Sequence, residues 1–224
     1  MTFSLVGRCA RTGRFGAVVT SSSPAVAARC AWARAGVGAA CTQNVTDPAL
    51  GPRLLDALSA GATATEALAE VVAGASYAEY RQLTVIDQAG AVASHSGVHT
   101  LGTHHTVEAT DCLAAGNLLT TPEVPEEMVR AFVADPAADL GDRLLAALSA
   151  GEEAGGEEGP VHSCGMVIVD KAPWPVTDLR VDWSDSPMGD LERAWKIWAP
   201  QAADYVTRAL DPTAAPSYGV PGDE

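Results

Sequence analysis

The stretch TFSLVGRC, residues 2–9, begins the chain with alternating, β-prone residues, and RTGR at 11–14 followed by FGAVVT at 15–20 completes the pattern of a hairpin. A glycine inside the RTGR segment suits a turn, because glycine adopts backbone conformations that other residues avoid. The next apolar segment, residues 29–42, is small and rich in glycine, which is typical of a buried pair of strands. The first 44 residues therefore predict an almost entirely β start to the fold.

The remainder of the chain alternates between helical and strand-like segments. Apolar residues at helical spacing predict helices over residues 52–60, 63–72, 121–133, 142–150 and 189–210. Short apolar runs predict strands over residues 82–87, 91–95, 164–170 and 176–183 and one ending near 117–119. This order favours an α+β fold, with two stacked antiparallel sheets and helices outside them, over a parallel βαβ sheet. We expect one domain over residues 1–210 and a mobile, Pro- and Gly-rich tail over residues 211–224.

The charge of the chain argues against several classes of partner. Its 14 Lys and Arg residues stand against 28 Asp and Glu residues, so the formal net charge is −14. Such a surface repels nucleic-acid phosphates and anionic lipid, which leaves a small-molecule substrate as the expected partner. No long apolar run suggests a membrane span or a signal peptide, and we expect a cytoplasmic protein. The glycines form neither G-x-G-x-x-G nor a P-loop, and no cofactor is expected.

The five cysteines do not form a recognisable framework. They are odd in number and widely spread, and no two form a C-x-x-C pair, which argues against disulfides and a zinc ribbon. Cys9 and Cys41 fall inside predicted strands with no partner for a catalytic triad. We therefore expect them to be buried structural residues rather than nucleophiles.

The first two residues permit a particular chemistry. Methionine aminopeptidases remove Met1 when the second residue is small, and Thr2 qualifies. Removal would leave the Thr2 hydroxyl beside its own α-amine, whose ordinary pKa near 8 leaves part of it neutral and able to accept the hydroxyl proton. Because Thr2 also begins a predicted strand, its position would be fixed. The sequence therefore predicts a candidate N-terminal nucleophile.

Several motifs spread along the chain resemble one bacterial family, the domain of unknown function 1028. They are MTFSLVGR at 1–8, WARAGVGA at 32–39, TQN at 42–44, PALGPR at 48–53, RQL at 81–83, HSG at 95–97, GNLL at 116–119, PEV at 122–124 and DLRVD at 178–182. The resemblance covers nearly all of the chain to about residue 200, although residues 21–24 and 98–108 depart from the family pattern. It implies the four-layer αββα sandwich of the Ntn (N-terminal nucleophile) hydrolases, which are related to proteasome subunits.

That resemblance also implies roles for individual residues. In proteasome-like sites, a residue after the second strand and a basic residue on the third assist the threonine. Ser21, Ser22 or Ser23 would take the first place. Arg34 would take the second, where its charge would lower the pKa of the Thr2 amine and hydroxyl. Alternatively, Arg34 pairs with a carboxylate at a sheet edge.

Polar residues that follow other predicted strands are candidates for binding the substrate or an oxyanion. Thr42, Gln43 and Asn44 lie at a strand end, where their donors would stabilise a tetrahedral intermediate, or where they form an ordinary turn. His95 and Asn117 follow strands whose ends would reach the same cleft. For His95, a structural hydrogen bond is the favoured alternative.

Histidines between two predicted strands raise the question of a metal. His99, His104 and His105, with Glu108 and Asp111, match no zinc or iron spacing, and we expect no metal there. They either lie on the surface or line the substrate pocket.

Three hypotheses follow. The first is an N-terminal-threonine amidohydrolase that cleaves a small linear or cyclic amide through an acyl-Thr2 intermediate. The second is a non-catalytic small-molecule-binding or scaffold protein with the same fold. The third, weaker, is a histidine-centred or metal-assisted hydrolase that uses His95 and residues 99–111. A homo-oligomer, dimer or higher, is expected in each case.

Overall fold

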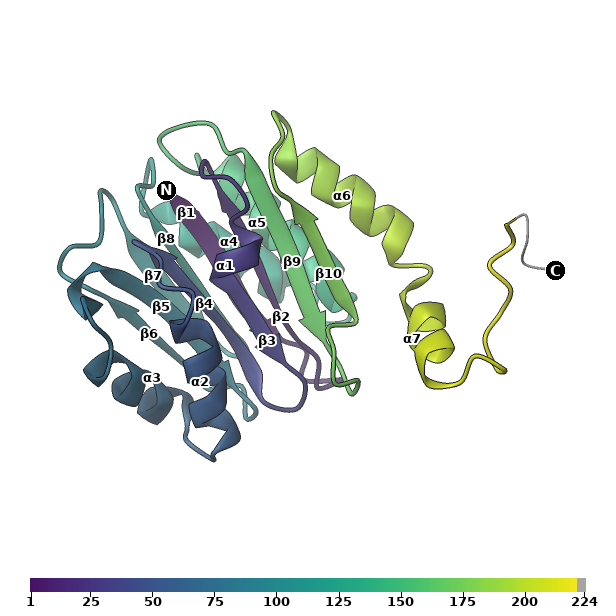
Figure 1. Ribbon diagram of the computed structural model, residues 1–224. Helices are drawn as coiled ribbons and strands as arrows, with labels where there is room; N and C mark the ends of the chain where they lie inside the picture. The colour runs from purple at the N-terminus through teal and green to yellow at the C-terminus, as the bar shows by residue number, and fades with distance from the viewer. Residues whose placement is uncertain (221–224) are drawn as a thin grey trace.

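The computed structural model describes residues 1–220 and shows an α+β protein with two antiparallel sheets (Figure 1). In spatial order, the strands of the first sheet are β10 (Thr177–Val181), β9 (Ser163–Val169), β2 (Phe15–Ser21), β1 (Thr2–Arg8), β8 (Cys112–Asn117) and β7 (His105–Ala109). The strands of the second are β3 (Ala31–Arg34), β4 (Gly38–Asn44), β5 (Arg81–Asp87) and β6 (Val92–Ser96). The predicted α+β class with antiparallel sheets is confirmed.

Seven α-helices lie within the described residues. They are α1 (Ala27–Cys30), α2 (Leu50–Ser59), α3 (Ala64–Ala73), α4 (Glu123–Ala134), α5 (Leu140–Glu153), α6 (Pro187–Trp198) and α7 (Ala202–Leu210). A single 3₁₀ turn, η1 (Ala78–Tyr80), precedes β5. The capping box expected before the third of these helices is present: Thr63 accepts from the backbone of Glu66, whose side chain accepts from the backbone of Thr63.

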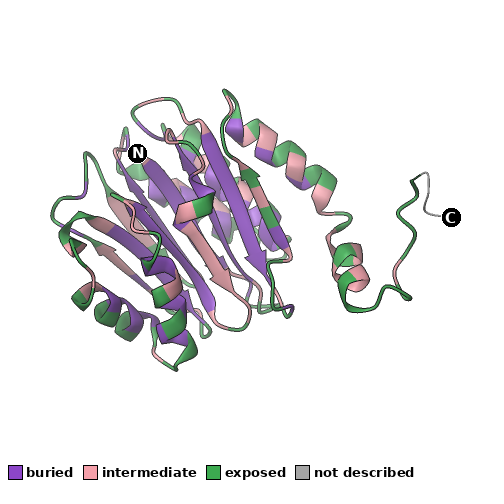
Figure 2. Cartoon of the chain, viewed as in Figure 1, coloured by how far each residue is buried: buried purple, intermediate pink, exposed green. Residues whose placement is uncertain are grey.

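Alternate residues of the central strand β1 are buried on opposite faces of the first sheet. Phe3 and Leu5 lie in a core shared with α4, α5 and α6, whereas Val6 lies in a core shared with β4 and β5 of the second sheet. On the second sheet, Ala40 belongs to a further core formed with α2 and α3. The packing on both faces buries every residue of β2 and every residue of β1 except Arg8, polar residues included (Figure 2).

Three segments differ from the sequence expectations. Helix α1 interrupts the region expected to be entirely β, and β7 forms within the histidine-containing segment because β8 offers it an edge to pair with. The helix expected over residues 189–210 is two helices with Pro200 between them, and a proline cannot donate the backbone hydrogen bond that a continuous helix requires.

The segment that follows α7 makes contacts with that helix. The Arg208 guanidinium lies 5.0 Å from the ring centroid of Tyr205 and 3.9 Å from that of Tyr218. The last four residues of the expected tail, 221–224, lie outside the described residues. Within the part of the chain that is described, no helix is long and apolar enough to cross a membrane.

Candidate active site

A row of polar residues crosses the first sheet at the end where the chain begins. The strand registers set Asn117 of β8 opposite Thr2 of β1, and Ser163 of β9 opposite Ser21 of β2. Continuing the β1–β2 register by one residue places Thr2 beside Ser21, and the two hydroxyl oxygens lie 3.4 Å apart. All four residues are at most 5% exposed. Because paired residues point to the same face of a sheet, their side chains share one surface.

A second polar row faces the first from the other sheet. Gln43 of β4 pairs with Gln82 of β5, which pairs with Ser96 of β6. The Ser4 hydroxyl of β1 donates to Gln43 Oε1 at 2.7 Å, which links the two sheets. A buried hydrogen-bond network thus lies directly behind Thr2.

Gln82 is the centre of this network. Its Oε1 accepts from Gln43 Nε2 at 2.8 Å and from Asn117 Nδ2 at 3.1 Å. Its Nε2 donates at 3.1 Å both to Ser96 Oγ and to the backbone oxygen of Gly116. The amide donors of Gln43 and Asn117 are therefore engaged, whereas Asn117 Oδ1 is buried without a hydrogen-bond partner.

Met1 covers the Thr2 hydroxyl. The backbone oxygen of Met1 accepts hydrogen bonds from the hydroxyls of both Thr2 and Ser21. Ser21 Oγ in turn accepts from the backbone N–H of Ser23 at 3.1 Å. Thr2 is only 5% exposed in this arrangement.

A buried carboxylate, Glu157, lies at the same end of the molecule. Its Oε2 accepts from the backbone N–H of Ser22 at 3.1 Å, while Oε1 has no hydrogen-bond partner. A β-bridge between Glu157 and Leu119, just beyond the end of β8, fixes its backbone. Burial raises the pKa of Glu157 to about 7, and the positive charge of the N-terminal amino group and the Ser22 hydrogen bonds oppose this rise.

The raised pKa of Glu157 predicts a pH-dependent stability. Between about pH 4.5 and pH 7 the folded state keeps a proton that the unfolded state releases, so the free energy of unfolding falls as pH rises through this window. We expect the free energy of unfolding of Glu157→Gln, measured relative to that of the wild type, to be about 2 to 3 kcal/mol higher at about pH 8 than at about pH 5. Urea unfolding at both pH values measures this. Because the neighbouring Glu158 is exposed, Glu158→Gln is the control. An equal change in relative stability for both variants would contradict the prediction.

Arg34 does not reach Thr2, and its predicted role is wrong. It pairs with Gly38 at the beginning of β4, whereas Gln43, which contacts the Thr2 strand through Ser4, lies five residues further along, about 17 Å away at 3.3 Å per residue. Its guanidinium donates to Asp56 Oδ1 at 2.8 Å and to Ser59 Oγ at 3.0 Å, both on α2. In Figure 1 the β3–β4 hairpin lies at the lower end of the molecule and the N-terminus at the upper end. The alternative, a carboxylate partner at the sheet edge, describes this residue.

Thr42 and Asn44 flank Gln43 but face away from the network. Residues alternate between faces along a strand, and only Gln43 of the three points between the sheets. The Thr42 hydroxyl donates to the backbone oxygen of Asp47 at 3.1 Å, so it stabilises a turn. Asn44, with a left-handed φ of 70°, donates to the backbone oxygen of Tyr80 and accepts from the backbone N–H of Leu101. Both residues thus fit the turn alternative rather than an oxyanion site.

His95 also lies outside the polar network. It pairs with Leu83 rather than with Gln82, and therefore points to the opposite face of the second sheet. One of its ring nitrogens, Nε2, is hydrogen-bonded to the backbone oxygen of Ala78 at 3.0 Å. The structural hydrogen bond favoured from the sequence is present, and the proposed contact with substrate is not supported.

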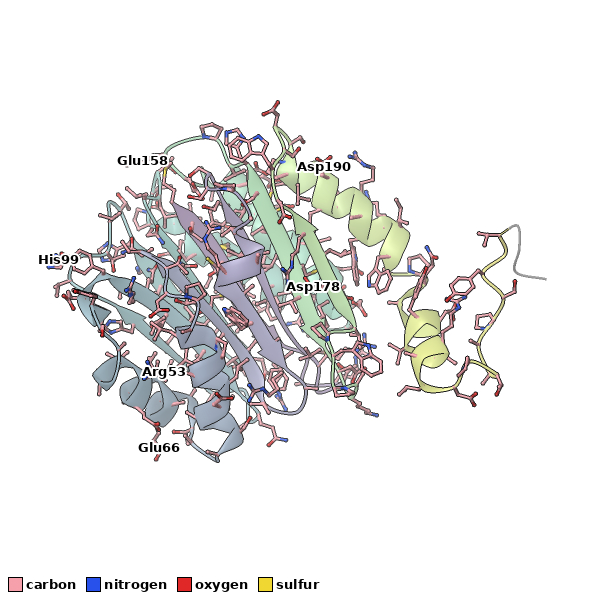
Figure 3. All side chains as sticks on the ribbon, viewed as in Figure 1. Arg53, Glu66, His99, Glu158, Asp178 and Asp190 are labelled. Carbon is pink, nitrogen blue, oxygen red and sulfur yellow. The ribbon has the colours of Figure 1, made fainter. Side chains whose placement is uncertain are left out.

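The other histidines and the cysteines are dispersed. The His99 ring lies against that of Tyr80, with centroids 4.7 Å apart and planes tilted by 39°. His104 Nδ1 is hydrogen-bonded to the backbone oxygen of Gly102, and His105 lies 3.8 Å from Glu126. Figure 3 labels His99 at the edge of the molecule. Among residues 1–220, no three His, Cys, Asp or Glu side chains are grouped to hold a metal ion. All five cysteines are free and buried.

Four residues of the site escape the sequence patterns. Ser4, Gln82 and Ser163 appear as ordinary polar positions within apolar strands. Only the tertiary structure places Ser4 and Gln82 in the network beside Thr2 and sets Ser163 opposite Ser21. Glu157 lies in an acidic, glycine-rich segment that resembles a solvated loop. No signal in the sequence indicates its burial.

The fold and the site together define an α+β protein with a polar network between two antiparallel sheets. The first strand begins with a threonine that lies beside this network and is buried beneath Met1. The chain belongs to a family of unknown function, DUF1028, whose model matches residues 2–191. The family expected from the sequence motifs is confirmed.

Solved structures include a related fold. Protein SPO2555 from Silicibacter pomeroyi, of the same family, is 28% identical, with a TM-score of 0.83 over 91% of this chain and 94% of that one. Anbu from Hyphomicrobium sp. strain MC1 is 14% identical over 91% of this chain and 98% of that one, with a TM-score of 0.43. Anbu (ancestral beta-subunit) from Yersinia bercovieri is 12% identical over 92% and 97%, with a TM-score of 0.42. TM-scores below 0.5 do not establish a common fold. No curated protein matches the chain.

Proposed function

We propose that this protein is an N-terminal-threonine amidohydrolase in which Thr2, once Met1 is removed, attacks a small linear or cyclic amide. The observation that carries the proposal is the row formed by Thr2, Ser21 and Asn117. A hydroxyl at the start of the chain is held by strand register against a second hydroxyl and a buried acceptor without a partner. Buried polar groups are normally satisfied, so the unpaired acceptor beside Thr2 suggests a missing donor. A free α-amine would supply one.

The proposed reaction uses the α-amine of Thr2 as the base. Thr2 Oγ1 forms a bond to the carbonyl carbon of the substrate as its proton passes to the amine. The C–N bond of the substrate then breaks, the leaving nitrogen takes the proton from the ammonium, and the acyl group remains on Oγ1. Water, deprotonated by the same amine, attacks the ester carbon and releases the acid, which regenerates the Thr2 hydroxyl.

Ser21 is the proposed donor to the oxygen that becomes negative during attack. Its hydroxyl already donates to a carbonyl oxygen, that of Met1, beside the Thr2 hydroxyl. A donor placed in this way is worth about 3 kcal/mol in comparable enzymes. Gln43 and Asn117 donate to Gln82 instead, and would act by holding the floor of the site rigid.

The arrangement of sheets and helices supports the proposed class. Apolar cores join the first sheet to α4, α5 and α6, the second sheet to α2 and α3, and the two sheets to one another. We propose that this is the four-layer αββα sandwich of the Ntn-hydrolases, which the sequence motifs also imply.

A non-catalytic small-molecule-binding or scaffold role is the second candidate. It is favoured by the hydrogen bonds that Met1 makes over Thr2, because a retained methionine would leave the hydroxyl covered and without its base. The two candidates differ in whether Met1 is present in the mature protein.

The test begins with the intact mass of protein produced without an N-terminal tag. The proposal requires a mass lower by one methionine. It also requires that a small β-lactone, which acylates activated hydroxyls, form one adduct that peptide mass spectrometry places on Thr2. A retained Met1, or an adduct elsewhere, would favour the binding protein.

A further inference from the structure

Glu157 is a buried carboxylate that no step so far described uses. It is 5% exposed, yet no Lys or Arg side chain is paired with it among the ion pairs of the described residues. A buried carboxylate without a cationic partner is costly, since burial removes its hydration. The one positive group that acts on Glu157 is the amino group at the N-terminus. The N-terminal amino group is therefore the candidate cationic partner of the Glu157 carboxylate.

Three observations place this carboxylate near Thr2. Glu157 is bridged to Leu119, which lies two residues beyond Asn117, the β8 partner of Thr2. Its Oε2 is bound to the N–H of Ser22, the residue after Ser21, whose hydroxyl contacts the Thr2 hydroxyl. Two residues beyond Glu157, Gly159 lies beside the Met1 side chain, 3.5 Å from Met1 Cε to the position a Cβ would take. Glu157 thus borders the space that Met1 occupies.

We propose that Glu157 is the positioning residue that binds the α-amino group of Thr2 after Met1 is removed and orients it beside the Thr2 hydroxyl. Its unpartnered Oε1 accepts one N–H of the amine, and the lone pair is thereby turned toward Oγ1. When the hydroxyl proton moves to the amine during attack, the resulting ammonium forms next to a carboxylate. This inference rests on the proposed function, because it assumes that Thr2 is the N-terminal residue.

The charge of Glu157 predicts a specific change in the titration of the amine. A carboxylate close to an ammonium stabilises its charged form and raises the pKa of the amine by about one to three units. Glu157→Gln keeps the size and an acceptor oxygen but removes the charge. We therefore expect the midpoint of Thr2 acylation against pH to fall by about one unit or more. The plateau rate should fall about tenfold, because the developing ammonium loses its partner.

Glu158→Gln is the matched control. It removes the same charge one residue away, where the side chain is exposed; Figure 3 labels Glu158 at the end of the molecule where the N-terminus lies in Figure 1. Its midpoint should stay with that of the wild type. If Glu157→Gln does not fold, Glu157→Asp keeps the charge but draws it back by one methylene. The acylation midpoint of Glu157→Asp should stay close to that of the wild type, whereas its plateau rate should fall.

The experiment measures the amine directly as well as through acylation. The ¹³Cβ shift of Thr2 in threonine-labelled protein, assigned by its absence in Thr2→Ser, follows protonation of the α-amine without any substrate. A midpoint lowered in Glu157→Gln but not in Glu158→Gln supports the inference, even if the β-lactone fails to react and the proposed function falls. Equal midpoints in wild type and Glu157→Gln overturn the inference while acylation at Thr2 sustains the function. A retained Met1 overturns both.

Discussion

Thr2→Ala is expected to abolish acylation by the β-lactone, with a rate at least about a thousandfold below that of the wild type. The variant keeps an N-terminal α-amine, because alanine also permits removal of Met1, but it has no hydroxyl to attack. Thr2→Ser retains both groups and should react within about tenfold of the wild type. Time courses of the intact mass give all three rates.

Thr20→Ala is the matched control for this result. Thr20 is a buried threonine on the adjacent strand, but it faces the helix-covered side of the first sheet, where it pairs with Phe3 and donates to the backbone of Ser163 at 2.9 Å. The Thr20→Ala variant should lose a comparable buried hydrogen bond but still be acylated at Thr2. Acylation that persists in Thr2→Ala, or that is lost equally in Thr20→Ala, would count against Thr2 as the nucleophile.

Gln82→Leu is expected to lower the free energy of unfolding by about 3 to 5 kcal/mol. Leucine has a similar volume but no polar atoms, so the amide donors of Gln43 and Asn117 would stay buried without the acceptor they share. Each buried polar group left unsatisfied costs about 1 to 3 kcal/mol. Urea unfolding monitored by circular dichroism measures the loss.

Gln88→Leu provides the comparison for the same substitution on the surface. Gln88 is exposed in the turn after β5, and its replacement should change the free energy of unfolding by less than about 0.5 kcal/mol. If Gln82→Leu were as stable as Gln88→Leu, the network behind Thr2 would not be held together by Gln82.

Most of the secondary structure could be predicted from local patterns. The first hairpin, the capping box at Thr63 and the alternation of strand and helix blocks each depend on residues close together in the sequence. The break between α6 and α7 has a local cause in Pro200, whereas the formation of β7 depends on tertiary contacts. Strand β7 has weak local signals and forms because it pairs along β8.

The candidate site divides in the same way. The sequence by itself determined that Thr2 begins a strand, that Ser21 directly follows the apolar residues 15–20 of the next, and that the chain has the family motifs. Only the tertiary structure decided which polar residues meet, because strand register and the choice of face depend on pairings between distant segments. The same register carries Arg34 to the opposite end of β4 and turns Thr42 and His95 away. Burial of Glu157 depends on its bridge to Leu119, which no pattern within its own acidic segment could indicate.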